Sequence, residues 1–304
     1  MEFPECPRRL RPERMMILTT LIVASVVVCR GQAVNVAPRW QVTYPAAANG
    51  RPSESTAVPV SGESDLVAVV LSGADAARPQ MRVGNREIPA RMIGHDPVSR
   101  LGFYKVEGAM APRATAWLEN AGGADGMNLK ALAPDGPVKC RTNGWVKQVG
   151  GKILPLALLR VNFEKPVPPP GTPLVDDGGR VAGIVFQAAG GANTGYAIPA
   201  EAVHRVRRDV YSSGKLVRGW LGLALLAENQ APQIVRVLAG SPAAKAGVMP
   251  NDVLLTVGSR RISDYADAAN AFFYLVPGEP VKVRVMRGVE TLEFNLTPTR
   301  PQAE

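Results

Sequence analysis

The sequence is short of the residues that build metal sites and disulfide frameworks. It has 2 His and 3 Cys. Cys6 and Cys29 lie near the N-terminus, so Cys140 is the one thiol in the rest of the chain. A single thiol forms no intramolecular disulfide, and His95 and His204 are too far apart in the sequence for metal-ligand spacing. The sequence therefore predicts no disulfide framework, no metal and no other cofactor, and a buried strand position for Cys140.

The sequence also lacks a long apolar run. The uncharged segment 15–28 is shorter than the ~20 residues that a membrane-spanning helix needs. Four arginines between positions 8 and 14 precede it, and small residues that fit a cleavage site end at Ala33. This order is typical of a secretory signal, so we expect a signal peptide over 1–33 and export to the periplasm or beyond the cell. The alternative is an uncleaved signal that anchors the protein in the membrane through residues 15–28.

Charged residues are few and evenly distributed. They make up 20% of the chain and hydrophobic residues 46%, which excludes a disordered protein. The formal net charge is +9, but no basic run is interleaved with aromatic side chains, which are only 6% of the sequence. This distribution argues against a nucleic-acid partner and predicts a basic, solvated surface.

Glycine and proline, by contrast, are abundant, with 30 and 27 residues, and this favours short strands and turns. Residues 34–65 show little periodicity and are interpreted as a loop or a ragged first strand. Gly150-Gly151 separates two long strand-like runs and predicts a hairpin. Together the runs predict an antiparallel barrel or sandwich. They lie at 66–71, 81–83, 88–92, 101–106, 129–132, 138–149, 152–163, 181–186 and 195–198.

The periodicity changes after residue 200. Three valines of the segment 200–211 fall on one face of a helix, and Gly214 is a plausible stop. Beyond it, short strands mix with helices capped by Ser241 and by Ser263 or Asp264, as in a small α+β module. The expected organisation is a signal or anchor, a poorly patterned segment, a β domain with its linker helix, and the α+β module. Their bounds are 1–33, 34–65, 66–212 and 213–300.

The α+β module contains three distinctive motifs, which are Lys215–Leu223, Ala239-Gly-Ser-Pro-Ala-Ala-Lys-Ala-Gly-Val248 and Pro250–Leu254. Together these motifs closely resemble the PDZ domain of HtrA-type proteases. This resemblance implies that a peptide C-terminus or extended segment adds as a strand to a sheet edge. The implied peptide-binding residues are Arg218, Trp220, Leu221, Gly222, Leu223 and Phe272. The resemblance implies that the loop 220–223 holds the carboxylate and that Arg218 favours a negatively charged ligand end. Phe272 would line a side-chain pocket, or alternatively only pack in the core.

Residues 66–212 contain a second ordered set of motifs, which are Ile93–Pro97 with Leu101–Val106, Gly171–Asp176 with Gly179–Val185, and Gly195–Pro199. These segments resemble the trypsin-like protease domain of the same family. The resemblance implies a mostly β fold, a trypsin-like double β-barrel that is partly degenerate, followed by the α+β PDZ domain.

The chain departs from this family at the catalytic positions. Pro170 stands where the family has its serine nucleophile, and Pro168 and Pro170 have no N–H for an oxyanion hole. Arg100 replaces the aspartate, and the nearest counterpart of the histidine is Pro59, within 56–60. His95 and His204 are interpreted as a loop residue and a helix-surface residue. Thr172 is an alternative nucleophile, but no base accompanies it.

These departures predict a non-catalytic binding or regulatory protein, in which a PDZ domain captures peptide C-termini or extended segments on a pseudoprotease scaffold. One alternative is an active HtrA-like endopeptidase whose register is misread, with Ser53, Ser55 or Ser61 under consideration. Another is an assembly subunit that forms homo-oligomers or pairs with active HtrA-type proteases.

Overall fold

The computed structural model describes residues 40–44, 53–60, 65–71, 80–83, 85–107, 116–119, 125–226 and 231–301. The expected signal peptide at 1–33 and the anchor at 15–28 lie outside these residues. Val36–Glu304 form one compact unit. None of the helices among the described residues combines the length and the apolar character needed to cross a membrane.

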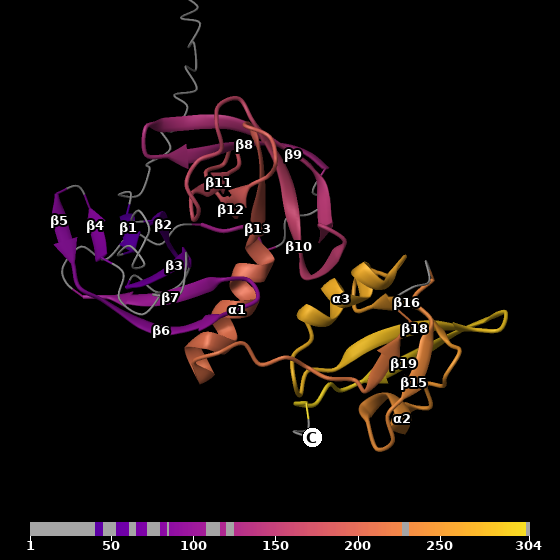
Figure 1. Ribbon diagram of the computed structural model, residues 1–304. Helices are drawn as coiled ribbons and strands as arrows, with labels where there is room; N and C mark the ends of the chain where they lie inside the picture. The colour runs from indigo at the N-terminus through magenta and orange to yellow at the C-terminus, as the bar shows by residue number, and fades with distance from the viewer. Residues whose placement is uncertain are drawn as a thin grey trace, which may run out of the picture. The chain divides into compact units, whose positions relative to one another are not determined.

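The first sheet has seven antiparallel strands (indigo to purple in Figure 1). Its order is β5-β4-β1-β2-β3-β7-β6, and β3 is buried along its whole length. The strands are β1 (Trp40–Tyr44), β2 (Ser53–Pro59), β3 (Leu66–Val70), β4 (Gln80–Val83), β5 (Arg86–Ile88), β6 (Ala90–Asp96) and β7 (Leu101–Val106). Two strands therefore come from the segment 34–65, whose sequence shows little pattern. Part of the reason is that Ser55 and Thr56 are buried although they are polar, which hides the alternation of β2.

The second sheet closes into a barrel with the order β10-β13-β12-β11-β8-β9. Its strands are β8 (Asp125–Ala133), β9 (Gly136–Val149), β10 (Lys152–Phe163), β11 (Pro173–Val175), β12 (Val181–Ala188) and β13 (Thr194–Pro199). Gly150 and Gly151 turn the β9–β10 hairpin with φ values of 56° and 76°, which confirms the predicted hairpin. Cys140 is buried in β9, as expected.

A single helix follows the barrel. Helix α1 (Ala200–Ser213) ends at Gly214, which adopts a left-handed conformation with φ 73° and donates its N–H to the carbonyl of Val210. Val203, Val206 and Val210 are buried in the cluster between the barrel strands and the helix. The apolar face and the glycine stop both agree with the sequence prediction.

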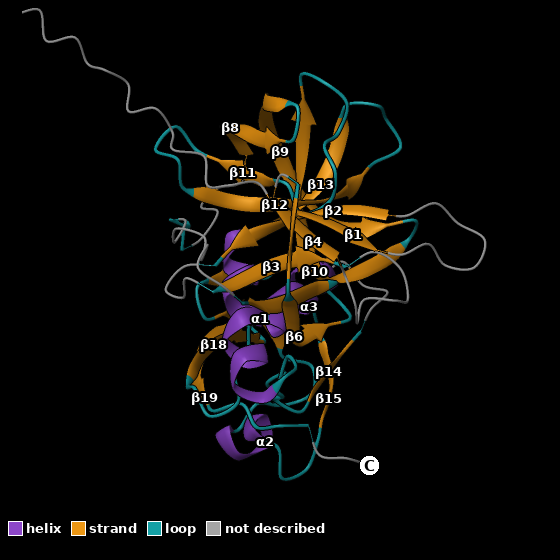
Figure 2. Cartoon of the chain, turned by 90° about the vertical axis from the view of Figure 1, so that its left-hand side faces the viewer, coloured by secondary structure: helices purple, strands orange, loops and turns teal. Residues whose placement is uncertain are grey.

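The remaining residues form an α+β unit with two sheets, β14-β15 and β17-β16-β18-β19. Ser241 caps α2 and Asp264 caps α3 by accepting backbone N–H groups. The helices are the purple segments of Figure 2. The elements are β14 (Leu223–Leu225), β15 (Ile234–Val237), α2 (Pro242–Ala246), β16 (Val253–Val257), β17 (Arg260–Arg261), α3 (Tyr265–Phe273), β18 (Val281–Arg287) and β19 (Glu290–Leu296). The fold is mostly β, as predicted.

Candidate functional site

The loop before β14 is built around a glycine. Gly222 has φ 81°, and a Cβ added to it would lie 2.1 Å from Cβ of Ser241. The carbonyls of Leu221 and Gly222 accept the N–H groups of Ala243 at 3.1 Å and Leu238 at 2.9 Å. These two hydrogen bonds hold the loop in place through its carbonyl groups.

Two donors of this loop remain available. Within the described part of the chain, the backbone N–H groups of Leu221 and Gly222 have no acceptor. The N–H of Trp220, by contrast, donates to the carbonyl of Thr299 at 2.8 Å. Adjacent unpaired N–H groups in a tight loop form a concave site for an anion such as a carboxylate.

The loop opens on an apolar pocket of about 250 Å³. All six predicted peptide-binding residues line it together: Arg218, Trp220, Leu221, Gly222, Leu223 and Phe272. Ala269 and Phe273 of α3 add to the same wall. Phe272 also packs against the core cluster of the α+β unit, so it contacts both the pocket and the core. Among the described strands β14 pairs with β15 alone, which leaves its other edge open for an added strand.

Arg218 supplies positive charge at this pocket. Its guanidinium carbon lies 6.0 Å from the centre of the Phe273 ring. In the described part of the chain it forms no ion pair with a carboxylate. The charge is therefore available to a ligand.

Within the residues that the structure describes, the barrel loop at Pro170, unlike the loop before β14, has no free backbone N–H group. Pro168, Pro169 and Pro170 have no N–H, and the N–H of Gly171 donates to the carbonyl of Val185 at 2.7 Å. The carbonyl of Pro170 accepts the N–H of Thr56 at 2.8 Å. This segment offers no backbone donor to an oxyanion.

Thr172 is removed from solvent as well. Its side chain is fully buried, and its hydroxyl donates to the carbonyl of Pro169 at 2.7 Å. A ligand would have to displace this packing to reach the hydroxyl. The geometry therefore gives no support to Thr172 as a nucleophile.

Arg100 lies at the turn between β6 and β7. Its Nε and Nη2 donate to the carbonyl of Leu71 at 2.9 and 2.7 Å, and its guanidinium lies 4.9 Å from the Phe186 ring centre. A cation in this position cannot orient or stabilise a protonated imidazole.

The structure places Leu71, and not Pro59, beside Arg100. Pro59 pairs with Val67 near the start of β3, whereas Leu71 follows the end of that strand. Leu71 is four residues beyond Val67, the partner of Pro59, and four residues of extended chain span roughly 13 Å. Arg100 thus contacts the backbone of Leu71, whose aliphatic side chain offers no base.

The histidines lie elsewhere. His95 is an exposed residue of β6 rather than of a loop, and it pairs with Gly102. His204 on α1 is half-buried, stacks edge-on against Trp117 at 5.7 Å and lies 3.2 Å from the carbonyl of Leu118. Burial lowers the pKa of His204, which keeps it neutral. Among the described residues no group of His, Cys, Asp and Glu could hold a metal ion.

Sequence reasoning missed two pocket residues. Pro155 of β10 and Pro301 near the C-terminus line the pocket with the predicted residues. The sequence contains one indication for Pro155, because a proline inside a strand-like run indicates an edge strand or a bulge. Nothing in the local sequence relates either proline to the loop before β14.

Comparison with known proteins agrees with this geometry. The sequence family described as PDZ domain matches residues 219–297. A probable periplasmic serine endoprotease, DegP-like, from Ectopseudomonas mendocina (strain ymp) is 28% identical over 245 residues, which are 74% of this chain and 52% of that protein. Its counterpart in Chlamydia trachomatis serovar D is 26% identical over 240 residues, 71% of this chain and 47% of that protein. The chain thus spans about half the length of these curated relatives.

Solved structures share the fold. An HtrA-type protease, AlgW, with a tripeptide superposes with a TM-score of 0.62 at 20% identity, covering 88% of this chain and 95% of that chain. A serine endoprotease from Yersinia pestis superposes with a TM-score of 0.54 at 19% identity, covering 88% and 95%. The chain therefore contains a PDZ domain, shares the trypsin-like fold of HtrA-type proteases, and is similar in sequence to DegP-like serine endoproteases.

Proposed function

We propose that this protein is a non-catalytic peptide-binding protein, whose PDZ domain captures protein C-termini or extended segments on a pseudoprotease scaffold. One observation carries the proposal: among the described residues, two N–H groups of the loop before β14 are unpaired at an apolar pocket, while the loop at Pro170 has no free N–H. The first loop can hold an anion, and the second cannot stabilise one.

The mode of binding follows from the elements around the pocket. A ligand strand pairs with the open edge of β14, and its terminal carboxylate accepts the N–H groups of Leu221 and Gly222. Arg218 adds favourable charge at that end. The last side chain of the ligand enters the apolar pocket beside Phe272, where burial supplies much of the affinity.

Three features support the absence of proteolysis. Prolines occupy 168–170, Arg100 bonds to the backbone of the aliphatic residue Leu71, and Thr172 is buried. Removing a single oxyanion donor costs ~10²–10³ in rate, and here the nucleophile, the base and the donors are all missing. Peptide hydrolysis is therefore expected to be absent.

Export is part of the proposal. The relatives are named as periplasmic, and residues 1–33 have the order of a secretory signal. We place the protein in the periplasm or outside the cell, either alone, as a homo-oligomer, or with an HtrA-type partner. Sedimentation of the purified chain, with and without an active HtrA-type protease, separates these assemblies.

The decisive experiment measures binding of the purified chain to a library of peptides with free C-termini, with the same peptides amidated as controls. We expect selective binding that weakens when the carboxylate is amidated. Equal binding of acid and amide forms would favour capture of internal segments. No binding in either form would contradict the proposal.

The names of the relatives favour a second candidate, an active endopeptidase. Of the serines considered for it, Ser55 donates its hydroxyl to the carbonyls of Val70 and Pro170, each at 3.0 Å. Turnover of casein by the purified chain, blocked by a serine-protease inhibitor, would establish this candidate. Absence of turnover is the result that the proline loop predicts.

A further inference from the structure

The PDZ pocket has one wall that the PDZ domain does not supply. Pro155 lines the pocket together with Ala269 and Phe272 of α3. Pro155 belongs to β10 of the closed barrel, and β10 lies next to α3 (Figure 1). A ligand side chain in the pocket would thus contact both halves of the chain.

Strand β10 is irregular at this point. Ile153 pairs with Gln148 and Leu158 with Val146, so β10 advances five residues while β9 advances two. Pro155 lies inside this bulge, where a residue without an N–H breaks no ladder bond. The bulge carries the proline out of the barrel wall to the pocket.

A residue of the PDZ domain accepts a hydrogen bond from a backbone N–H group of this bulge. The N–H of Ala157 donates to Oδ1 of Asn270 on α3 at 2.9 Å. Leu156 is buried in one apolar cluster with Phe273 of α3 and Val203 of α1. The bulge and α3 therefore form a single packed unit.

Both ends of α3 are attached to the barrel half as well. At its start, Lys147 of β9 forms an ion pair with Asp267. Just beyond its end, the hydroxyl of Tyr274 donates to Glu201 of α1 at 3.3 Å. The helix that forms one side of the pocket is thus held along its length.

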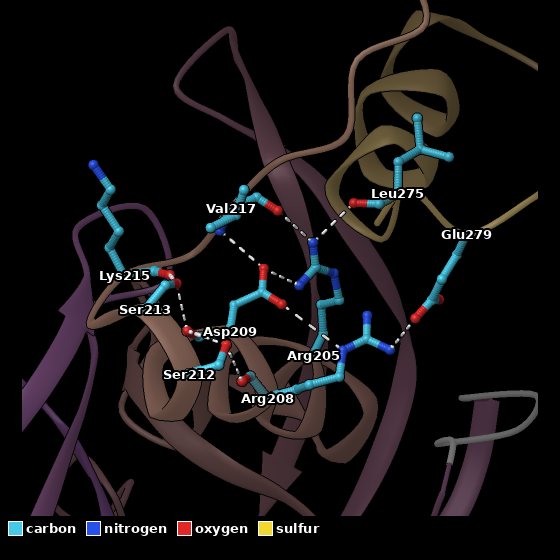
Figure 3. A network of polar contacts seen from close by, with 9 residues as sticks. All are labelled: Arg205, Arg208, Asp209, Ser212, Ser213, Lys215, Val217, Leu275 and Glu279. Atoms are coloured by element: carbon cyan, nitrogen blue, oxygen red, sulfur yellow. Dashed lines mark hydrogen bonds and ion pairs between the residues drawn. The ribbon is translucent and has the colours of Figure 1, made fainter. Parts of the chain in front are cut away.

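A buried ion pair on α1 completes this attachment (Figure 3). Arg205 pairs with Asp209, and their side chains are only 4% and 9% exposed. The guanidinium of Arg205 donates to the carbonyls of Val217 and Leu275, each at 2.8 Å. Asp209 accepts the N–H of Val217 at 2.8 Å. Buried pairs with this many hydrogen bonds are costly to break, so the linker and the segment after α3 stay in place.

From these contacts we infer that Pro155 is a specificity-determining residue, which sets how large a ligand side chain the PDZ pocket admits. The inference rests on the proposed peptide binding. Because α3 is fixed to the barrel half, it cannot retreat to admit a larger side chain, and close-packed walls yield little. The space between Pro155 and Phe272 therefore limits the ligand.

The test compares two proline substitutions in the full chain. Pro155→Ala removes the ring from the pocket wall, and Pro137→Ala removes a ring from an exposed position of the same hairpin. Affinities are measured for peptides that differ only in their last residue: alanine, valine, leucine, phenylalanine or tryptophan. Pro155→Ala is expected to move the preference toward the larger residues by about tenfold, as a change of a few methylenes does in an apolar pocket. Pro137→Ala is expected to leave the preference unchanged.

A third variant distinguishes the effect of the Pro155 ring in the pocket from the effect of the contacts that hold α3 to the barrel half. Lys147→Ala removes an ion pair of α3 without changing a pocket residue. The differences in affinity between the peptides are therefore expected to become smaller, while the order of their affinities stays the same. Circular dichroism of each variant confirms that it is folded.

The outcomes distinguish the inference from the proposed function. If the unmodified chain binds peptides and Gly222→Ala abolishes binding, the proposed function stands. An unchanged preference in Pro155→Ala then overturns the inference alone. If the unmodified chain binds no peptide, or binds it equally well with Gly222→Ala, the proposed function fails and the inference fails with it.

Discussion

Gly171 in the barrel and Gly222 in the PDZ domain have nearly the same φ, and both are closely packed. Their φ values are 82° and 81°, and an added Cβ would meet a neighbouring atom at 2.1 Å in both. They differ in their donors, because three prolines precede Gly171, whereas two N–H groups of the loop at Gly222 find no acceptor in the part of the chain that the structure describes. A closely packed glycine in the left-handed conformation therefore does not by itself make an anion site, because holding an anion depends on free donors.

The largest effect is expected from Gly222→Ala. The new Cβ would overlap Ser241 and sit at a φ that side chains rarely adopt, so the loop must move. We expect peptide affinity to fall at least about 30-fold, or roughly 2 kcal/mol, by fluorescence anisotropy. Gly240→Ala is the matched control, since it has φ 72° but no atom within 4 Å. Equal losses in the two variants would show that backbone strain, and not the loop, controls binding.

Arg218→Ala tests the charge beside the loop. We expect a loss of about fivefold, roughly 1 kcal/mol, for peptides with a free carboxylate, because the charge is partly exposed and screened. The loss should shrink at high salt and vanish for amidated peptides. An equal loss for both peptide forms would assign Arg218 a packing role on Phe273 instead.

Acid should weaken the PDZ domain. Burial alone would raise the pKa of Asp252, but hydrogen bonds from Arg287 and from the N–H of Met249, with the Arg287 charge, lower it overall. A carboxyl whose folded pKa lies below its unfolded value near ~3.9 stabilises the fold above that pH and loses this effect as pH falls further. Asp252→Asn should therefore be less stable than the unmodified chain at pH 7, and the difference should narrow below about pH 4.

Urea unfolding at several pH values measures this difference. A gap between the two proteins that stays constant down to pH 3 would mean that the Asp252–Arg287 contact does not stabilise the PDZ domain through its charge.

The smallest effect is expected from Pro170→Ser, which restores a hydroxyl to the barrel loop. Prolines at 168 and 169 still lack an N–H, and Leu71 and Arg100 supply no base. Casein turnover should stay at the background rate. Inhibitor-sensitive turnover by this variant would show that donors and a base are present after all, and would remove the contrast between the two loops.

The sequence predicts the PDZ loop well because its residues are contiguous. Gly222 and its neighbours lie in one short motif whose conformation is set locally, and the structure brings all of them to one pocket. The position beside Arg100 is harder, because β3 is an unbroken apolar run and no residue in it fixes the register. Leu71 becomes identifiable only from its pairing with Arg100 across the sheet.

The contribution of Pro155 depends on tertiary structure alone. A proline in a strand-like run indicates a bulge, but the Asn270 side chain that bonds to this bulge lies more than a hundred residues later in the sequence. The strands β1 and β2 were obscure for a different reason, since buried hydroxyl groups such as that of Ser55 are paired by hydrogen bonds that the sequence does not display.

The placement of Phe273 has a thermodynamic consequence. This residue of α3 is buried in the same apolar cluster as Leu156 of the barrel and Val206 of α1. Unfolding of either half would expose the apolar surface of the other, which couples their free energies of unfolding. The barrel and the PDZ domain should therefore melt together in one calorimetric transition, although their sheets share no strand.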